Sequence, residues 1–368
     1  MGGSESSRVG RVAQSSIKER IVFCKHTGYL SAFQADGLDH WENIGDGMID
    51  FAGSGVVHMT GGVAALIGSA ILGPRTGRFD SDGTPVSITP HSAALSGLGV
   101  LFLWFGWYGF NPGSTLALSG GFHFVAGKVA VTTTLAAAAG GSTALLIHFL
   151  CYQEFNLYPA LNVRVKGGLR LRISSIHRDC CLDFFPCSSS RQGVLGGLVA
   201  ICSGTAAVEP WASVLIGFLA AGVYTAGSRL LIKFQIDDPL DASPVHFLCG
   251  LYVDRKMKNR RSAQTLTFLS FSPSPPRKNS FGLYATAFLA TETNIKAAYG
   301  IDERGLFYGG DGTIFLANFA GSFLITIWVG VTSLVLFATL KFTGIFRVPK
   351  EEEEEGKISL ASARTRAL

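Results

Sequence analysis

Two histidines in apolar surroundings have the clearest potential for chemistry in this sequence. His58 lies within the apolar stretch from Asp50 to Gly73, and His246 follows the acidic run at 237–241. Imidazole exchanges protons near neutral pH, and a polar ring inside an apolar span is costly, so such rings often mark a pathway. At about 1.5 Å per helical residue, both histidines would lie about 12–15 Å deep, near the middle of a bilayer. They could form a hydrogen-bonded pair, or each could be satisfied separately by a backbone carbonyl.

A carboxylate and an aromatic cluster are the other candidates. Asp50 precedes an apolar run, where aspartate is a common helix N-cap; capping does not exclude a second, electrostatic role. Trp107, Phe110 and Ser114 stand at the end of another apolar run and combine aromatic faces with a hydroxyl. They could form an aromatic belt at a membrane interface. Alternatively, they could replace part of the water shell of a cation.

The composition predicts a membrane protein with several spans. The chain has 368 residues, of which 48% are hydrophobic and only 15% are charged, whereas soluble domains carry about 25% charged residues. The net charge of +5 is modest and its basic residues lie in loops, so no nucleic-acid partner is expected. The sequence offers no catalytic nucleophile arrangement and no phosphate-binding Gly-rich loop with Lys, which argues against an enzyme.

A metal site is not expected either. His177, Cys180, Cys181 and Cys187 could be drawn as zinc ligands, but their spacing matches no common zinc pattern. The prediction is therefore that the chain holds no metal and needs no cofactor.

Long apolar runs predict an all-α polytopic bundle with about seven spans. The expected spans are 48–73, 91–110, 122–150, 193–208, 212–232, 237–252 and 313–342. The sixth is interrupted by a basic, Ser/Pro-rich segment at 253–280, and an apolar run resumes at 281–290. Lysine and arginine gather at the ends of the odd-numbered spans, which predicts that these ends and the C-terminus are cytoplasmic. The segment 253–280 is the exception to this rule.

Six motifs resemble those of the ammonium transporter family, most closely its plant-type branch. They are DFAGSGVVHMTGG at 50–62, GPRTGRFD at 73–80, LFLWFGWYGFNPGS at 101–114, VEPWA at 208–212, IDDPLDASPVHFLCG at 236–250 and GLFYGGDG at 305–312. The resemblance implies a subunit of eleven helices with its own pore, assembled as a trimer in the plasma membrane. It also implies that the chain moves ammonium or methylammonium across the lipid bilayer.

The resemblance also implies roles for individual residues. His58 and His246 match the twin histidines that line the pore, and Asp50 matches the acid needed for ammonium conduction. Phe110 matches one of two gate phenylalanines. Trp107 and Ser114 fall in the outer vestibule that recruits ammonium, which then loses its water shell and a proton before passing the histidines.

The same resemblance divides the chain into a transmembrane domain and flanking segments. Residues 47–350 would form the transmembrane domain, and residues 1–46 would be a remnant of the family's first four helices. The segments 158–190 and 253–280 look like insertions, and 351–368 form an acidic cytoplasmic tail. An alternative function follows: a non-conducting subunit that joins full-length ammonium transporters in homo- or hetero-trimers and modulates them.

Overall fold

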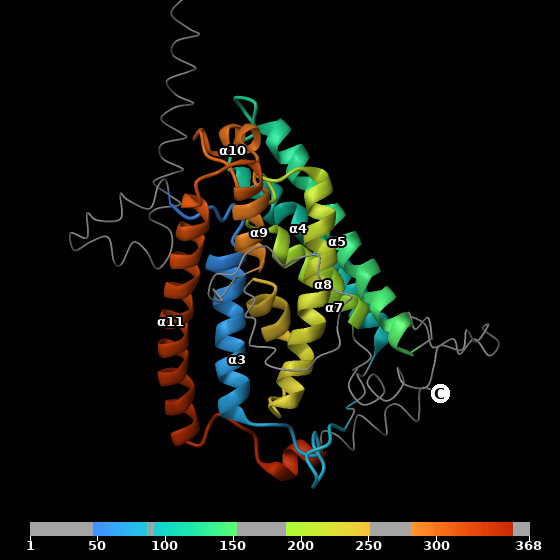
Figure 1. Cartoon of the computed structure of the whole chain (residues 1–368). Helices are drawn as coiled ribbons and strands as arrows, with labels where there is room; N and C mark the ends of the chain where they lie inside the picture. Colours follow the sequence, from blue (N-terminus) through green and yellow to red (C-terminus); the bar gives the residue numbers. More distant parts are fainter. Residues whose placement is uncertain (1–46, 87, 89–91, 153–188, 251–280, 356–368) are drawn as a thin grey trace, which may run out of the picture.

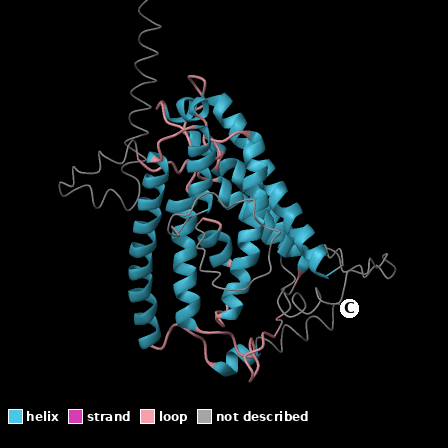
Figure 2. Ribbon diagram, in the orientation of Figure 1, coloured by secondary structure: helices cyan, strands magenta, loops and turns pink. Residues whose placement is uncertain are grey.

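The computed structural model describes residues 47–86, 88, 92–152, 189–250 and 281–355. These residues form helices joined by loops, as Figure 2 shows. The expectations for 1–46, for 253–280, for nearly all of 158–190 and for the tail beyond residue 355 lie outside them. The same holds for the cluster that begins at His177.

One side of the bundle is built from two long helices that run side by side (Figure 1). The first begins as a π-helical turn, η2 (Ser54–Met59), and continues as α3 (Thr60–Leu72). The second is α11 (Thr313–Phe342), which lies along α3. Both helices are predominantly apolar, as a lipid environment requires.

The other side is a group of three closely packed helices, α5 (Phe122–Tyr152), α7 (Ser189–Ile201) and α8 (Pro210–Lys233). Glycine lets their backbones approach. A Cβ on Gly193 would lie 2.6 Å from the carbonyl oxygen of Gly140, and one on Gly217 would lie 2.9 Å from the carbonyl carbon of Ala136. Close contact between small residues is how helices associate when lipid removes the hydrophobic driving force.

Shorter elements complete the described part of the chain. They are α4 (Ala93–Phe110), η3 (Pro112–Thr115), the π-helical turn η5 (Ser243–Leu248), α9 (Phe281–Leu289), α10 (Glu292–Tyr299) and η6 (Leu306–Tyr308). The N–H of Gly282 donates to the carbonyl of Cys249 at 3.2 Å, so the start of α9 lies against the end of η5.

Four helices in the described residues are long and apolar enough to cross a membrane. They are Ser54–Leu72, Phe122–Leu150, Pro210–Lys233 and Thr313–Phe342. Each overlaps one of the predicted spans. The prediction of an all-α membrane fold is confirmed.

Three predicted spans were wrong in their extent. The first span does not become helical until Ser54. In the described part of the sixth, residues 237–250, the short η5 stands in place of the expected long helix. The fourth ends at Ile201 instead of residue 208. After Ile201, the Ser203 and Thr205 hydroxyls bond to the carbonyls of Gly282 and Val129, and side chains of this type favour turns over helices.

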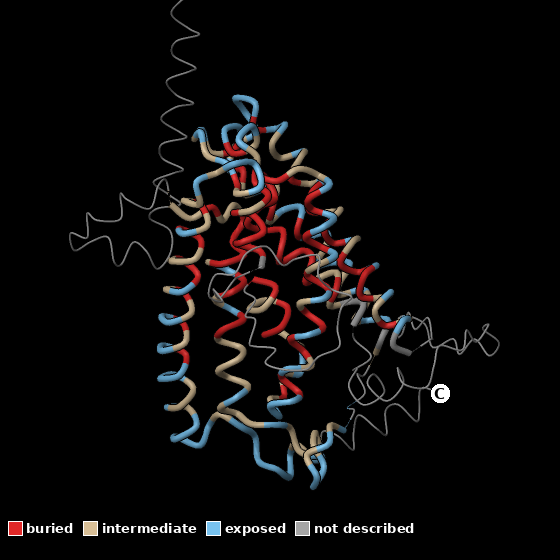
Figure 3. The backbone as a smooth tube through the Cα atoms, in the orientation of Figure 1, coloured by how far each residue is buried: buried red, intermediate tan, exposed pale blue. Residues whose placement is uncertain are grey.

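The buried residues collect in the middle of the bundle, where Figure 3 shows the tube coloured red. The outer faces of α4 and α11 instead expose large apolar side chains. Phe105 is 76% exposed on α4, and Val335 is 63% exposed on α11. Apolar side chains on an outer face suit contact with lipid or with another subunit.

Candidate functional site

Both predicted histidines lie on π-helical turns. In η2, the N–H of His58 donates to the carbonyl of Gly53 at 3.0 Å. Gly53 has φ +97°, which a residue with a side chain rarely adopts. In η5, which carries His246, the N–H of Cys249 donates to the carbonyl of Pro244 at 3.1 Å. Single π-helical turns are frequent at functional sites.

The structure brings the two histidine rings together. Their centroids are 5.3 Å apart and their planes differ by 20°, so they stack. The contact depends on Gly62, one turn after His58. A Cβ on Gly62 would lie 2.6 Å from the Cα of Phe247, the residue that follows His246. The absence of a side chain at Gly62 therefore allows α3 and η5 to meet at the depth of the histidines.

Two aromatic residues of α4 also contact His58. The Trp107 ring stacks on it, with 5.3 Å between centroids and 12° between planes. The Phe110 ring is tilted by 49° with its centroid 5.5 Å away. Trp107 and His58 are each only 8% exposed, so this cluster of rings is a buried, largely water-free environment.

Ser114, by contrast, is turned toward the end of α4. Its hydroxyl donates to the carbonyl of Phe110 at 2.8 Å, and its side chain is partly buried. It stands just beyond the aromatic cluster, in η3. Its hydroxyl oxygen keeps its acceptor capacity, because the hydrogen bond to Phe110 uses only the hydrogen.

The Asp50 side chain bonds the turn that carries His58. One of its carboxylate oxygens, Oδ2, accepts hydrogen bonds from the N–H groups of Gly55 and Val56, each at 3.0 Å. The other oxygen, Oδ1, is buried and has no hydrogen-bond partner among the described residues. The N-cap residue of η2 is Gly53, so Asp50 is not the N-cap itself. Its side chain instead bonds the first turn from three residues upstream, and the unpaired oxygen leaves room for a second role.

The segment after Asp50 is attached to the end of α7. The N–H groups of Phe51 and Ala52 donate to the carbonyls of Ser203 and Cys202 at 3.0 and 2.9 Å. These bonds hold the Asp50 end of η2 beside Cys202.

Cys202 is the central residue of this site that the sequence did not reveal. Its thiol lies 3.4 Å from Nε2 of His58 and 3.3 Å from Oδ1 of Asn111, and it accepts a hydrogen bond from Nε1 of Trp107 at 3.2 Å. No spacing pattern distinguishes this cysteine, and a cysteine in an apolar run is most simply a small apolar residue. Asn111 follows the aromatic motif directly, which was the one available signal for it.

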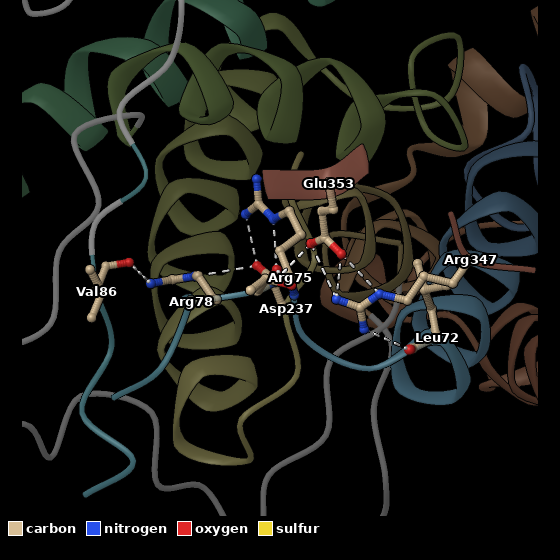
Figure 4. Close-up of polar contacts among 8 residues, drawn as sticks. Leu72, Arg75, Arg78, Val86, Asp237, Arg347 and Glu353 are labelled. Atoms are coloured by element: carbon tan, nitrogen blue, oxygen red, sulfur yellow. Dashed lines mark hydrogen bonds and ion pairs between the residues drawn. The ribbon is translucent and has the colours of Figure 1, made fainter. Parts of the chain in front are cut away.

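A second polar site lies beyond the C-terminal end of α3, at the end of that helix away from His58. There Arg75 donates to the carboxylate of Asp237 from Nε at 2.7 Å and from Nη2 at 2.8 Å, as Figure 4 shows. Arg78 donates from Nε to the same carboxylate at 3.3 Å. Burial alone would raise the pKa of Asp237, but the hydrogen bonds and charge of Arg75 outweigh it and lower the pKa.

The segment after α11 joins the same region (Figure 4). Glu353 accepts a hydrogen bond from the N–H of Thr76 at 2.8 Å and receives two from Nη2 of Arg347, at 2.9 and 3.2 Å. The hydrogen bond from Thr76 is the main reason why the pKa of Glu353 is lowered. The loop after α3 is thus held by carboxylates from two distant segments.

Asp237 leads directly into the turn that carries His246. The next residue, Asp238, accepts hydrogen bonds from the N–H and the hydroxyl of Ser243 at 2.6 and 2.7 Å, which caps η5. Carboxylates at a helix start are favoured by its unpaired N–H groups. The cluster around Arg75 therefore holds the segment that leads into η5.

Comparison with known proteins identifies the family. The profile of the Ammonium Transporter Family matches residues 22–169 and 187–253. Ammonium transporter 1 member 3 of Solanum lycopersicum is 35% identical over 379 residues, which cover 95% of this chain and 70% of that protein. The chain belongs to the ammonium transporter family. The resemblance inferred from the motifs is confirmed, and because the members are transporters, so is the prediction that the chain is no enzyme.

The chain spans about 60 to 70% of the length of these relatives. Ammonium transporter 1 member 2 of Arabidopsis thaliana is 32% identical over 374 residues, covering 94% of this chain but 61% of the relative. The profile match begins inside the segment 1–46, and its gap falls inside the insertion-like segment 158–190.

Solved structures share the fold. The structure titled Sensor Amt Protein matches with a TM-score of 0.61 and 26% identity over 84% of this chain and 58% of its own. Saccharomyces cerevisiae Mep2 matches with a TM-score of 0.58 and 23% identity, covering 80% of this chain and 52% of its own. No group of three or more potential metal ligands occurs in the described ranges.

Proposed function

We propose that this chain is a transporter subunit that conducts ammonium past His58 and His246. The observation that carries the proposal is the stacked histidine pair, closed on the His58 side by Trp107 and Phe110. Two imidazoles in contact can pass a proton or hold a neutral amine by hydrogen bonds. The surrounding rings exclude water, which favours neutral ammonia over a hydrated cation.

The aromatic cluster is also suited to binding ammonium before it reaches the histidines. Ammonium is a small cation, and the faces of Trp107 and Phe110 attract cations. The hydroxyl oxygen of Ser114, just beyond them, can accept a hydrogen bond from ammonium. We assign these three residues to recruitment and to the gate, and the charge of Asp50 to stabilising the cation as its water shell is lost.

We further propose how the subunit sits in the plasma membrane. The Arg75 end of α3 faces the cytoplasm, as does the end of α11, because Arg75, Arg78, Lys341 and Arg347 gather there. The Asp50 end then faces outward, and residues 47–350 form the transmembrane domain of a trimer subunit.

A second function is favoured by the outer face of α4. This face exposes apolar side chains, among them Leu101 at 63% and Phe102 at 68%. Such a face suits packing against another subunit. The chain would then assemble with longer ammonium transporters and modulate them without conducting by itself.

One experiment separates the two functions. The full chain is reconstituted alone in liposomes, and uptake of labelled methylammonium is measured with an inward ammonium gradient. Uptake above that of liposomes carrying the His58→Ala, His246→Ala double variant supports conduction. Equal uptake by both overturns it; the modulator function then requires that co-expression with a longer family member changes that member's transport.

A further inference from the structure

The thiol of Cys202 meets four partners, and three of them have fixed roles. Trp107 Nε1 can only donate, and it does so to the sulfur at 3.2 Å. The carbonyl oxygen of Leu198, at 3.0 Å, can only accept. A thiol has one hydrogen and two lone pairs. Trp107 therefore occupies one lone pair, and the acceptors compete for the single hydrogen.

The amide of Asn111 is the third fixed partner. Its Nδ2 donates to the hydroxyl oxygen of Thr133 at 3.0 Å. That hydroxyl donates its own hydrogen to the carbonyl of Val129 at 2.7 Å. The amide is thus oriented with Oδ1 facing the thiol of Cys202 at 3.3 Å, where it can only accept.

His58 is the one partner that can change its role. Leu198 and Asn111 both need the thiol hydrogen, and they lie closer to the sulfur than Nε2 of His58, which is 3.4 Å away. The sulfur then has only a lone pair to offer to Nε2. A stable contact therefore requires that Nε2 carries a hydrogen.

We propose that Cys202 is a positioning residue that holds the hydrogen of neutral His58 on Nε2. The Nδ1 atom of His58 is then left with a free lone pair, which can accept a hydrogen bond from a neighbour or from a passing ammonium-derived molecule. Cys202 itself touches no conducted species; it acts through the imidazole. The consequence for conduction rests on the proposed function, but the position of the hydrogen does not.

The test is a solid-state ¹⁵N spectrum of the full chain, labelled at histidine and reconstituted in lipid vesicles. Protonated and unprotonated ring nitrogens resonate far apart, and the His58 signals are assigned by their loss in His58→Gln. We expect a protonated Nε2 and an unprotonated Nδ1 in the unaltered chain. In Cys202→Ala the Nε2 signal should shift and a form with the hydrogen on Nδ1 should appear.

Cys202→Ser should restore the original spectrum, since a hydroxyl also has one hydrogen and two lone pairs. Cys249→Ala is the matched control, because Cys249 is equally buried but its thiol bonds to the carbonyl of Ala220. An unprotonated Nε2 in the unaltered chain overturns the proposal. So does a Cys202→Ala spectrum with unchanged His58 signals. If Cys202→Ala does not fold, the unaltered chain and Cys202→Ser still decide the outcome.

Discussion

The backbone of Phe247 lies directly against Gly62, so close that a Cβ on Gly62 would sit 2.6 Å from the Cα of Phe247. This contact joins α3 to η5 one turn from His58 and next to His246. The stacking of the two histidines therefore depends on a residue that itself does no chemistry.

Gly62→Ala should separate the histidine rings. The added methyl overlaps the main chain, which cannot move as a side-chain end can, and overpacking of this kind costs of order 1–3 kcal/mol. We expect a lower unfolding temperature and a loss of transport. Gly61→Ala is the matched control, because nothing lies within 4 Å of a Cβ at that position. Equal behaviour of the two variants would show that the close approach is unimportant.

His58→Ala and His246→Ala test the pathway itself. Each removes one imidazole from the stacked pair, and losing a hydrogen-bonding group worth ~1–3 kcal/mol predicts a rate decrease of about fivefold to 150-fold. Uptake of methylammonium into liposomes measures the rate. A competing potassium gradient measures selectivity. Unchanged rate and selectivity in both variants would exclude a pathway role for the histidines.

Asp50→Asn separates capping from electrostatics. An asparagine Oδ1 can still accept from the N–H groups of Gly55 and Val56, so the fold and thermal stability should be retained. The negative charge is lost, however, and transport should fall to background. Asp50→Ala removes the cap as well and should additionally destabilise the protein by about 1 kcal/mol. Full transport by a folded Asp50→Asn variant would mean that Asp50 is only a cap.

Asp237 gives a pH-dependent contribution to stability. Because its pKa is lowered in the folded protein, the ion pair stabilises the fold above the unfolded pKa, about 4. The stabilisation is lost as the pH falls through the folded pKa. We expect Asp237→Asn to lower the unfolding temperature at pH 7, and the difference from the unaltered chain to shrink below about pH 4. The control is Glu292→Gln, in an exposed pair with Arg304, which should change little.

Deletion of 253–280 tests whether this segment is an insertion in one helix. Once it is removed, Gly282 follows Cys249 by five positions, which is the spacing of the π-type hydrogen bond already present between them. Closing a loop of this length costs about 3 kcal/mol, so the deletion should raise the unfolding temperature. Replacing the segment with a Gly/Ser linker of equal length should leave stability near that of the unaltered chain. Loss of folded protein on deletion would show that the segment contributes to the fold.

The sequence by itself determined the local features of this protein. Long apolar runs predicted the helices 122–152, 210–233 and 313–342 within two residues at each end, because hydrophobic length and charged ends are local properties. The family motifs, which include the two histidines, are local features as well. Asp50 was identified as a possible cap from its position before an apolar run.

Only the tertiary structure decided what these features touch. No local propensity signals the π-helical turns that carry His58 and His246. The close approach of Gly62 to Phe247, which brings these turns together, is also a tertiary contact. The contacts of Cys202 join α4, η2 and α7. Those of Asp237 join the segment before η5 to the loop after α3. Each depends on side chains distant in sequence, and pairing across such distances is set by packing, which local residue patterns do not encode.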